Sequence, residues 1–306
     1  MEQLLRNTFL YLAKSQATNR LAKRYGLRLG ATRFVAGETI QTAIQAVKQL
    51  NQSGIVATLD HLGEFVYTRE ESVEAADFCI RTLDAIHESG VQSNLSLKMT
   101  QLGLDISQEL CLENMRRILT RAQQYGSFVR IDMEDYQHNE ITLEIFSTLK
   151  QEFGATVGLV IQAYLFKSAQ DVLNLNEFQP NLRLVKGAYK EPATVAFPNK
   201  GDVDANFVKL IQMHLLNGNY TAVATHDEKI IEQVKQFVRD RKISNSQFEF
   251  QMLYGIRTNL QHELASEGYT VRVYVPYGDD WYGYFMRRLA ERPANVGFVL
   301  KSLVKA

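Results

Sequence analysis

Short apolar segments alternate with longer amphipathic segments along most of the chain. The first pair is an apolar run over 55–60, typical of a buried strand, followed over 69–89 by apolar residues at helical spacing. The same alternation continues almost to the end of the chain. It predicts further strands over 92–98, 127–132, 156–162, 182–186, 220–225, 248–253 and 270–275, and further helices over 107–125, 139–153, 168–177, 203–216, 228–239 and 258–266.

Eight strand–helix units within about 250 residues match the usual size of a (β/α)8 barrel. A doubly wound open sheet is the alternative, but the regular repeat favours a closed TIM-like barrel of the α/β class. We expect this barrel to occupy residues 54–306. We expect an N-terminal helical arm over 1–53, which ends with a helix over 38–52.

The last unit has the clearest boundaries. Pro276 has no amide hydrogen to give to a sheet, so we expect the eighth strand to stop there. Gly278 turns the chain, and Asp279 or Asp280 is a good N-cap for the helix that follows. Pro293 disfavours helical geometry at the residue before it and should end this helix.

The final helix has a polar face. Tyr284, Arg287, Arg288 and Glu291 are spaced so that they lie on one side of it. Two guanidinium groups can hold a carboxylate at fixed angles through several charge-assisted hydrogen bonds. The alternative is a solvated face with a weak ion pair between Arg287 and Glu291.

Composition narrows the class of protein. The chain is 45% hydrophobic and 22% charged with a net charge of zero, so it has no general nucleic-acid-binding character. Cys79 and Cys111 both fall in predicted helices, where we expect buried thiols and a reducing, cytoplasmic compartment. No apolar run has membrane-spanning length, and the start of the chain has no signal-peptide pattern.

Positive charge is concentrated at the start of the chain. Residues 2–35 contain seven Lys and Arg residues against one Glu, a local net charge of +6. We favour one or two packed helices that close an end of the domain. Peripheral contact with the inner face of a membrane is the alternative.

Polar residues end most of the predicted strands. In a barrel of this kind the carboxyl ends of all the strands meet at one mouth, where catalytic groups lie. Each such residue alone could cap a helix or face solvent, but together they indicate a site. They are Asp60, Lys98, Asp132, Gln162, the turn over 186–189, Thr225, His226, Gln251 and Tyr274.

Several other chemistries have no support in the sequence. There is no H-E-x-x-H motif and no paired cysteine spacing for zinc, and we predict no metal. There is no P-loop, no G-x-G-x-x-G and no G-x-S-x-G. Two alternatives stay open: a lyase or aldolase that uses Lys98 or Lys186 as a Schiff base, and a non-catalytic barrel that binds amino acids.

Two segments carry a family resemblance. The segment LRLVKGAY over 182–189 and the segment YFMRRLAERPAN over 284–295 closely resemble the proline dehydrogenases, and the resemblance covers nearly the whole chain after the arm. It implies a (β/α)8 barrel that binds flavin adenine dinucleotide (FAD) without a covalent bond. It also implies that the last helix lies over the barrel mouth, which would bring Arg287 and Arg288 into the site.

The resemblance implies a role for each matching residue. Arg287 and Arg288 would bind the proline carboxylate, Glu291 would orient an arginine, Lys98 would lie beside the carboxylate, and Asp132 would lie between flavin and substrate. The residues that would line the substrate ring are Tyr189, Leu253, Tyr274 and Tyr284. The residues that would contact the flavin are Asp132, Met133, Gln162, Arg183, Val185, Lys186, Gly187, Ala188, Thr225, His226, Gln251, Arg287 and Glu291. Asp227 departs from the family pattern, which often has Asn after this histidine.

The implied activity is oxidation of L-proline to Δ1-pyrroline-5-carboxylate, the first step of proline catabolism to glutamate. Hydride would pass from C5 of proline to N5 of the flavin, and the electrons would go on to a membrane quinone. The chain is too short to include an aldehyde dehydrogenase domain, so the product would go to a separate pyrroline-5-carboxylate dehydrogenase.

Overall fold

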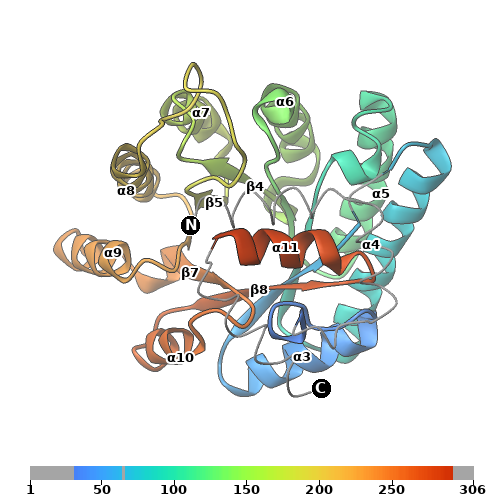
Figure 1. Cartoon of the computed structure of the whole chain (residues 1–306), viewed down its shortest axis with the longest axis horizontal. Helices are drawn as coiled ribbons and strands as arrows, with labels where there is room; N and C mark the ends of the chain where they lie inside the picture. The colour runs from blue at the N-terminus through green and yellow to red at the C-terminus, as the bar shows by residue number, and fades with distance from the viewer. Residues whose placement is uncertain (1–30, 64–65, 292–306) are drawn as a thin grey trace.

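Eight parallel strands close into a barrel in the computed structural model, which describes residues 31–63 and 66–291 (Figure 1). The strands follow one another in chain order, and β8 pairs with β1. They are β1 (Val56–His61), β2 (Ser93–Leu97), β3 (Val129–Ile131), β4 (Val157–Gln162), β5 (Leu182–Val185), β6 (Thr221–Ala224), β7 (Phe248–Leu253) and β8 (Val271–Tyr277). The predicted barrel is therefore confirmed, and the open sheet is excluded.

Helices surround the barrel on its outside (Figure 1). They are α3 (Ile40–Gln52), α4 (Arg69–Ser89), α5 (Gln108–Gln124), α6 (Tyr136–Phe153), α7 (Ser168–Leu175), α8 (Lys200–Leu216), α9 (Glu228–Asp240) and α10 (Thr258–Ser266). Within the described residues, no helix is both long and apolar enough to cross a membrane.

Local sequence explains where these helices begin and end, as α4 illustrates. The Thr68 side chain accepts a hydrogen bond from the Glu71 amide, and the Glu71 carboxylate accepts one from the Thr68 amide at 3.0 Å. These reciprocal bonds satisfy amides that the first helical turn leaves free. Gly90 ends the helix with φ 65°, a left-handed conformation that suits glycine.

Helices α3 and α11 do not lie where their order in the chain would suggest. Helix α3 packs its buried Ala43 and Val47 into the main core and contacts β1 and β8. In Figure 1 it lies between α10 and α4, where a helix following β8 would complete the ring. Helix α11 (Trp281–Glu291) instead crosses the barrel mouth, as predicted (Figure 1).

Strand β8 runs through Pro276 to Tyr277, so the prediction that Pro276 ends the strand is wrong. The pairing of β8 with β7 ends at Leu253 and Tyr274, before the proline is reached. Pro276 pairs only with Asp60 of β1, and its carbonyl accepts a hydrogen bond from the Ala36 amide at 2.9 Å. Because β7 has already ended, the absence of an amide hydrogen on Pro276 costs no hydrogen bond between β7 and β8.

A second hydrophobic cluster, separate from the barrel core, anchors α11. It consists of Ala31, Phe34, Val35, Leu62, Trp281, Tyr282, Tyr284, Phe285 and Met286. Residues just before α3 therefore pack against the helix that covers the mouth. The packing is close at Gly255, where a Cβ would lie 1.7 Å from the carbonyl oxygen of Arg33, so only glycine fits. Residues 1–30 of the predicted arm lie outside the described residues, and the boundary at residue 53 remains a prediction.

Candidate functional site

Asp132 lies at the centre of the barrel mouth, directly after β3, and is only 9% exposed. Its Oδ1 accepts hydrogen bonds from the Ser96 hydroxyl at 2.7 Å and from Arg183 Nη1 at 2.6 Å. Its Oδ2 accepts one from the Tyr274 hydroxyl at 2.8 Å. Side chains from β2, β5 and β8 therefore converge on this one carboxylate.

Lys98, directly after β2, lies between two carboxylates. Its Nζ is 3.3 Å from Oδ2 of Asp60 and 3.7 Å from Oδ2 of Asp132. Asp60 is in β1 and is 1% exposed. The order Asp60–Lys98–Asp132 thus alternates negative, positive and negative charge across adjoining strand ends.

The two carboxyls respond differently to this setting. Burial raises the pKa of both, because a low-dielectric environment disfavours the charged form. At Asp132 the charges of Arg183 and Lys98 outweigh burial, and the pKa is lowered below its ordinary value. At Asp60 burial outweighs Lys98, and the pKa is raised. Burial, followed by the charges of Asp132 and Asp60, raises the pKa of Tyr274, so its neutral phenol acts as a donor to Asp132.

Arg183 connects this cluster to β7. Its Nε donates to Gln251 Oε1 at 2.6 Å, and its guanidinium carbon lies 5.3 Å from the centre of the Tyr274 ring. Its Nη2 is buried and has no hydrogen-bond partner among the described residues. The same is true of Oε1 of Gln162, whose Nε2 donates to the Glu134 carbonyl at 3.0 Å.

These two atoms bear on the cofactor. A buried polar atom without a partner is costly, so a donor on Arg183 and an acceptor on Gln162 at the same mouth suit a polar ligand. Gly187 adds close packing: its φ is +109°, and a Cβ there would lie 2.4 Å from the Tyr164 ring. The residues present therefore fit a flavin, which has both hydrogen-bond donors and acceptors.

The turn after β5 carries a second charged group. Lys186 Nζ lies 2.5 Å from Asp204 of α8 and 3.1 Å from Asp227. Burial raises the pKa of Asp227, but its hydrogen bond and charge contact with Lys186 lower the pKa overall. Val185 is half-buried, while Ala188 is exposed and Tyr189 is 41% exposed.

The ends of β6 and β7 are joined by side chains. His226 Nε2 accepts a hydrogen bond from the Leu253 amide at 3.0 Å, which fixes the proton on the other ring nitrogen when the ring is neutral. Thr225 Oγ1 accepts one from the Asp227 amide at 3.1 Å. Met133 is 5% exposed, and its sulfur accepts a hydrogen bond from Asn139, so it faces α6.

On α11, Tyr284 is buried and Arg287 and Arg288 are half-buried. The guanidinium carbon of Arg288 lies 5.1 Å from the centre of the Tyr284 ring. This helix lies over the mouth and not on the outer surface of the barrel, so its polar face is only partly solvated. The side chain of Glu291 lies outside the described part of the chain.

The structure thus brings Lys98, Asp132, Arg183, Gln251 and Tyr274 into one cluster, which is joined by hydrogen bonds and, at Lys98, by an ion pair with Asp132. Two contributors had no assigned role in the sequence interpretation. The sequence predicts Asp60 only as a strand end and predicts no role for Ser96. Ser96 lies two residues before Lys98 and therefore on the same side of β2, so strand alternation was the available signal.

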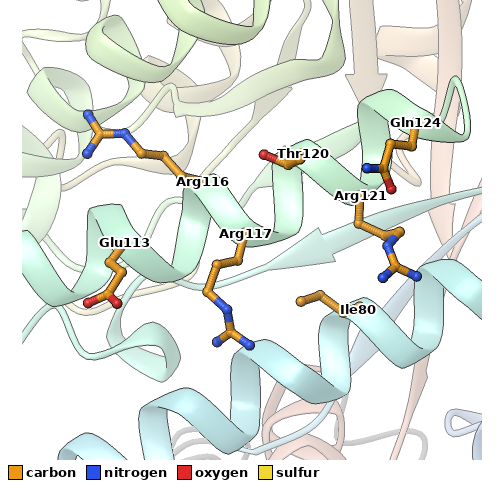
Figure 2. Close-up of a pocket in the computed structure, with 7 residues that line it drawn as sticks. All are labelled: Ile80, Glu113, Arg116, Arg117, Thr120, Arg121 and Gln124. Carbon is orange, nitrogen blue, oxygen red and sulfur yellow. The ribbon is translucent and has the colours of Figure 1, made fainter.

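Another hollow lies away from the mouth, on the outer face of α4 and α5, with a volume of about 630 Å³ (Figure 2). Three arginines line it, and each has a carboxylate partner. Arg116 binds Glu152 at 2.6 Å, Arg121 binds Asp84 at 2.6 Å, and Arg117 binds Asp77. These are partly exposed ion pairs, a kind that contributes little to stability. Because carboxylates of the chain already pair with these arginines, the barrel mouth remains the candidate site.

Comparison with known proteins agrees with the geometry. Proline dehydrogenase 1 of Bacillus subtilis (strain 168) is 55% identical over 302 residues, which are 99% of this chain and 100% of the relative. Proline dehydrogenase of Deinococcus radiodurans is 49% identical over 100% of this chain and 99% of its own length.

A solved structure of proline utilization A (PutA) from Bdellovibrio bacteriovorus, inactivated by N-propargylglycine, superposes with a TM-score of 0.80 at 28% identity. It covers 85% of this chain and 32% of that chain. The family model described as proline dehydrogenase matches residues 43–301. From the barrel, its charged mouth and these matches together, the chain belongs to the proline dehydrogenase family.

Proposed function

We propose that this protein oxidises L-proline to Δ1-pyrroline-5-carboxylate with FAD as cofactor, the first step of proline catabolism. The observation that carries the proposal is the cluster of Lys98, Asp132, Arg183 and Tyr274 at the mouth that α11 covers. It supplies an anion, two cations and an aromatic ring within contact of one another. A small zwitterion with an apolar ring matches that set of groups.

FAD, when bound, supplies the hydride acceptor. The unpartnered Nη2 of Arg183 and Oε1 of Gln162 would hold its polar ring edge. The backbone and side chains of the residues after β3, of the turn after β5 and of the ends of β6 and β7 would hold the rest. These residues are Asp132, Met133, Val185, Lys186, Gly187, Ala188, Thr225, His226 and Gln251, with Arg287 and Glu291 from α11.

The substrate would lie between the strand ends and α11. Arg287 and Arg288 would bind its carboxylate together with Lys98, because guanidinium groups fix a carboxylate at defined angles. Glu291 would orient one of these arginines. Tyr189, Leu253, Tyr274 and Tyr284 would line its ring.

Asp132 and Lys98 would set the charge around the substrate nitrogen. That nitrogen must be a neutral amine, so that its lone pair can assist as hydride leaves C5. The low pKa of Asp132, caused by Arg183 and Lys98 despite burial, keeps this group an anion that accepts hydrogen bonds. Contacts to the carboxylate at one end of the substrate and to the ring at the other would keep C5 in one orientation. This lowers the entropic part of the barrier to hydride transfer.

The Schiff-base alternative is disfavoured by the same geometry. A nucleophilic lysine must be a neutral amine. Lys98 lies between Asp60 and Asp132, and Lys186 lies between Asp204 and Asp227. Each amine is therefore engaged by two carboxylates and is not presented to a carbonyl substrate.

Two partners complete the proposal. A membrane quinone would take the electrons, which would bring the protein to the inner face of a membrane as a peripheral protein. A separate pyrroline-5-carboxylate dehydrogenase would consume the product.

Anaerobic addition of L-proline to the purified protein tests the proposal. We expect a yellow protein whose visible flavin absorption is bleached by L-proline, and FAD in the extract of the denatured protein. D-proline at the same concentration is the control. A colourless protein that borohydride couples to a carbonyl compound would favour the Schiff-base alternative instead.

A further inference from the structure

Glu249 lies beneath the site, inside the barrel, and is 2% exposed. It is two residues before Gln251 on β7, so both side chains are on the inner side of the strand. Arg272 Nε donates to its Oε1 at 2.9 Å, and the Tyr220 hydroxyl donates to its Oε2 at 3.0 Å. Gln251 Nε2 donates to the same Oε1 as Arg272.

The surroundings of Glu249 favour an ionised carboxylate. Burial raises its pKa, but Arg272, which is both charged and hydrogen-bonded to it, lowers the pKa overall. Gln251 and Arg130 lower it further. An ionised carboxylate only accepts hydrogen bonds.

Gln251 therefore lies between the Glu249 carboxylate, which only accepts hydrogen bonds, and the Arg183 guanidinium, which only donates them. Its amide must present NH2 to Glu249 and oxygen to Arg183 Nε, which it receives at 2.6 Å. With Nε bound to Gln251 and Nη1 bound to Asp132 at 2.6 Å, the plane of the Arg183 guanidinium is fixed. The remaining nitrogen, Nη2, is the buried one without a partner among the described residues.

We propose that Glu249 is a positioning residue for the cofactor site. It fixes the orientation of the Gln251 amide, and Gln251 in turn orients Nη2 of Arg183 toward the flavin. The proposal rests on the proposed function, since it takes FAD as the group that Arg183 meets. The chain from Glu249 to Gln251, Arg183 and Asp132 consists of hydrogen bonds at each step.

The variant Glu249→Gln tests this. A glutamine at 249 has no negative charge and can both donate and accept, so it no longer fixes which side of the Gln251 amide faces Arg183 Nε. Tyr220→Phe is the matched control, because it removes a hydrogen bond from the other oxygen of Glu249 and leaves the Gln251 side intact. Both variants lose one polar function from the same buried network.

Three measurements are made on each protein: the Kd of the flavin-free form for FAD, the visible spectrum of the bound flavin, and kcat and KM for L-proline. For Glu249→Gln we expect the Kd for FAD to rise about tenfold or more, the size of effect of one misdirected charge-assisted hydrogen bond. We also expect a shifted flavin spectrum and a lower kcat, with KM within about twofold. Tyr220→Phe should match the wild type within about twofold in each.

The proposal is overturned if Glu249→Gln binds FAD with unchanged affinity and spectrum, or if Tyr220→Phe changes both equally. If Glu249→Gln does not fold, Glu249→Asp decides, because it keeps the buried negative charge beside Arg272 but shortens the side chain that reaches the Gln251 amide. A folded Glu249→Asp protein whose Kd for FAD rises about tenfold or more, with a shifted flavin spectrum, supports the proposal. An unchanged Kd and spectrum overturn it. Bleaching of the wild-type flavin by L-proline is scored separately and tests only the proposed function.

Discussion

The hydroxyl of Tyr274 donates a 2.8 Å hydrogen bond to Oδ2 of Asp132, and so joins β8 to the end of β3, two strands that are not neighbours in the barrel. The bond uses the only polar atom of the Tyr274 side chain. The rest of the Tyr274 side chain is an apolar aromatic ring that lies beside the guanidinium of Arg183. A substrate at the mouth would meet this ring as an apolar surface.

We therefore predict a preference for L-proline over trans-4-hydroxy-L-proline. A 4-hydroxyl group against this ring would lose water without a certain partner, at a cost of roughly 1–3 kcal/mol. Tyr274→Ser should narrow the preference, chiefly by lowering kcat/KM for proline. Tyr274→Phe keeps the ring and should keep the preference. Comparable kcat/KM for both substrates in the wild type would remove Tyr274 from the determination of specificity.

Arg287→Met and Arg288→Met should each weaken proline binding while FAD stays bound. Each change would remove the proposed charge-assisted contacts to the carboxylate, worth roughly 1.5–3 kcal/mol, so KM should rise by about tenfold or more. Arg116→Met on the outer face of α5 is the control, since that arginine pairs with Glu152, away from the mouth. An unchanged KM in both α11 variants would refute the role of these arginines as a carboxylate clamp.

Asp227 combines two functions that substitutions can separate. Its Oδ1 caps α9 by accepting the Lys229 amide at 3.2 Å, and its Oδ2 pairs with Lys186 at 3.1 Å. Asp227→Asn keeps an oxygen for the cap and removes the charge, so the free energy of unfolding should change by only a few tenths of a kcal/mol. Asp227→Ala loses both and should cost about 1 kcal/mol. Urea unfolding at pH 7 measures both. Equal losses would mean that the charge pair, and not the cap, is the stabilising contact.

His61 should make stability depend on pH. Burial lowers the pKa of its imidazole to about 4, and the ring stacks on Phe78 with centroids 3.7 Å apart. As pH falls from about 6.5 toward 4, the unfolded chain binds a proton that the folded protein does not, so stability is full above this window and falls within it. The loss attributable to His61 is about 3 kcal/mol at most.

The comparison is between the wild type and His61→Phe, which keeps an aromatic stack. We expect the variant to lose less unfolding free energy between pH 7 and pH 4.5. His214, whose pKa burial also lowers to about 4, is present in both proteins and gives a common background slope. Parallel pH profiles for the two proteins would contradict the assignment to His61.

Most of the fold and the centre of the site follow from local pattern. Asp132, Lys98 and Tyr274 were predictable because parallel strands bring their carboxyl ends to one mouth, whatever the details of packing. The continuation of β8 through Pro276 was not, because it depends on where β7 ends. The sequence around Pro276 does not show where β7 ends.

The partners of the charged residues were also beyond local pattern. Lys186 pairs with Asp204, which lies in α8 after a long loop. Glu249 lies in a strand whose residues other than Gln251 are apolar, and only the positions of Arg272, Tyr220 and Gln251 show what it binds. Pairings of this kind depend on tertiary distances, which residue type and periodicity do not determine.

The separate cluster that holds α11 has a thermodynamic consequence. Because Phe34, Trp281 and Phe285 belong to it and not to the barrel core, detaching this helix exposes only that small apolar surface. Opening of the mouth should then be a local unfolding reaction, with a free energy below that of global unfolding. In native-state hydrogen exchange, we expect the α11 amides to exchange before those of the barrel strands, at denaturant concentrations where the barrel remains folded. Access to the site and survival of the fold would thus be governed by two different equilibria.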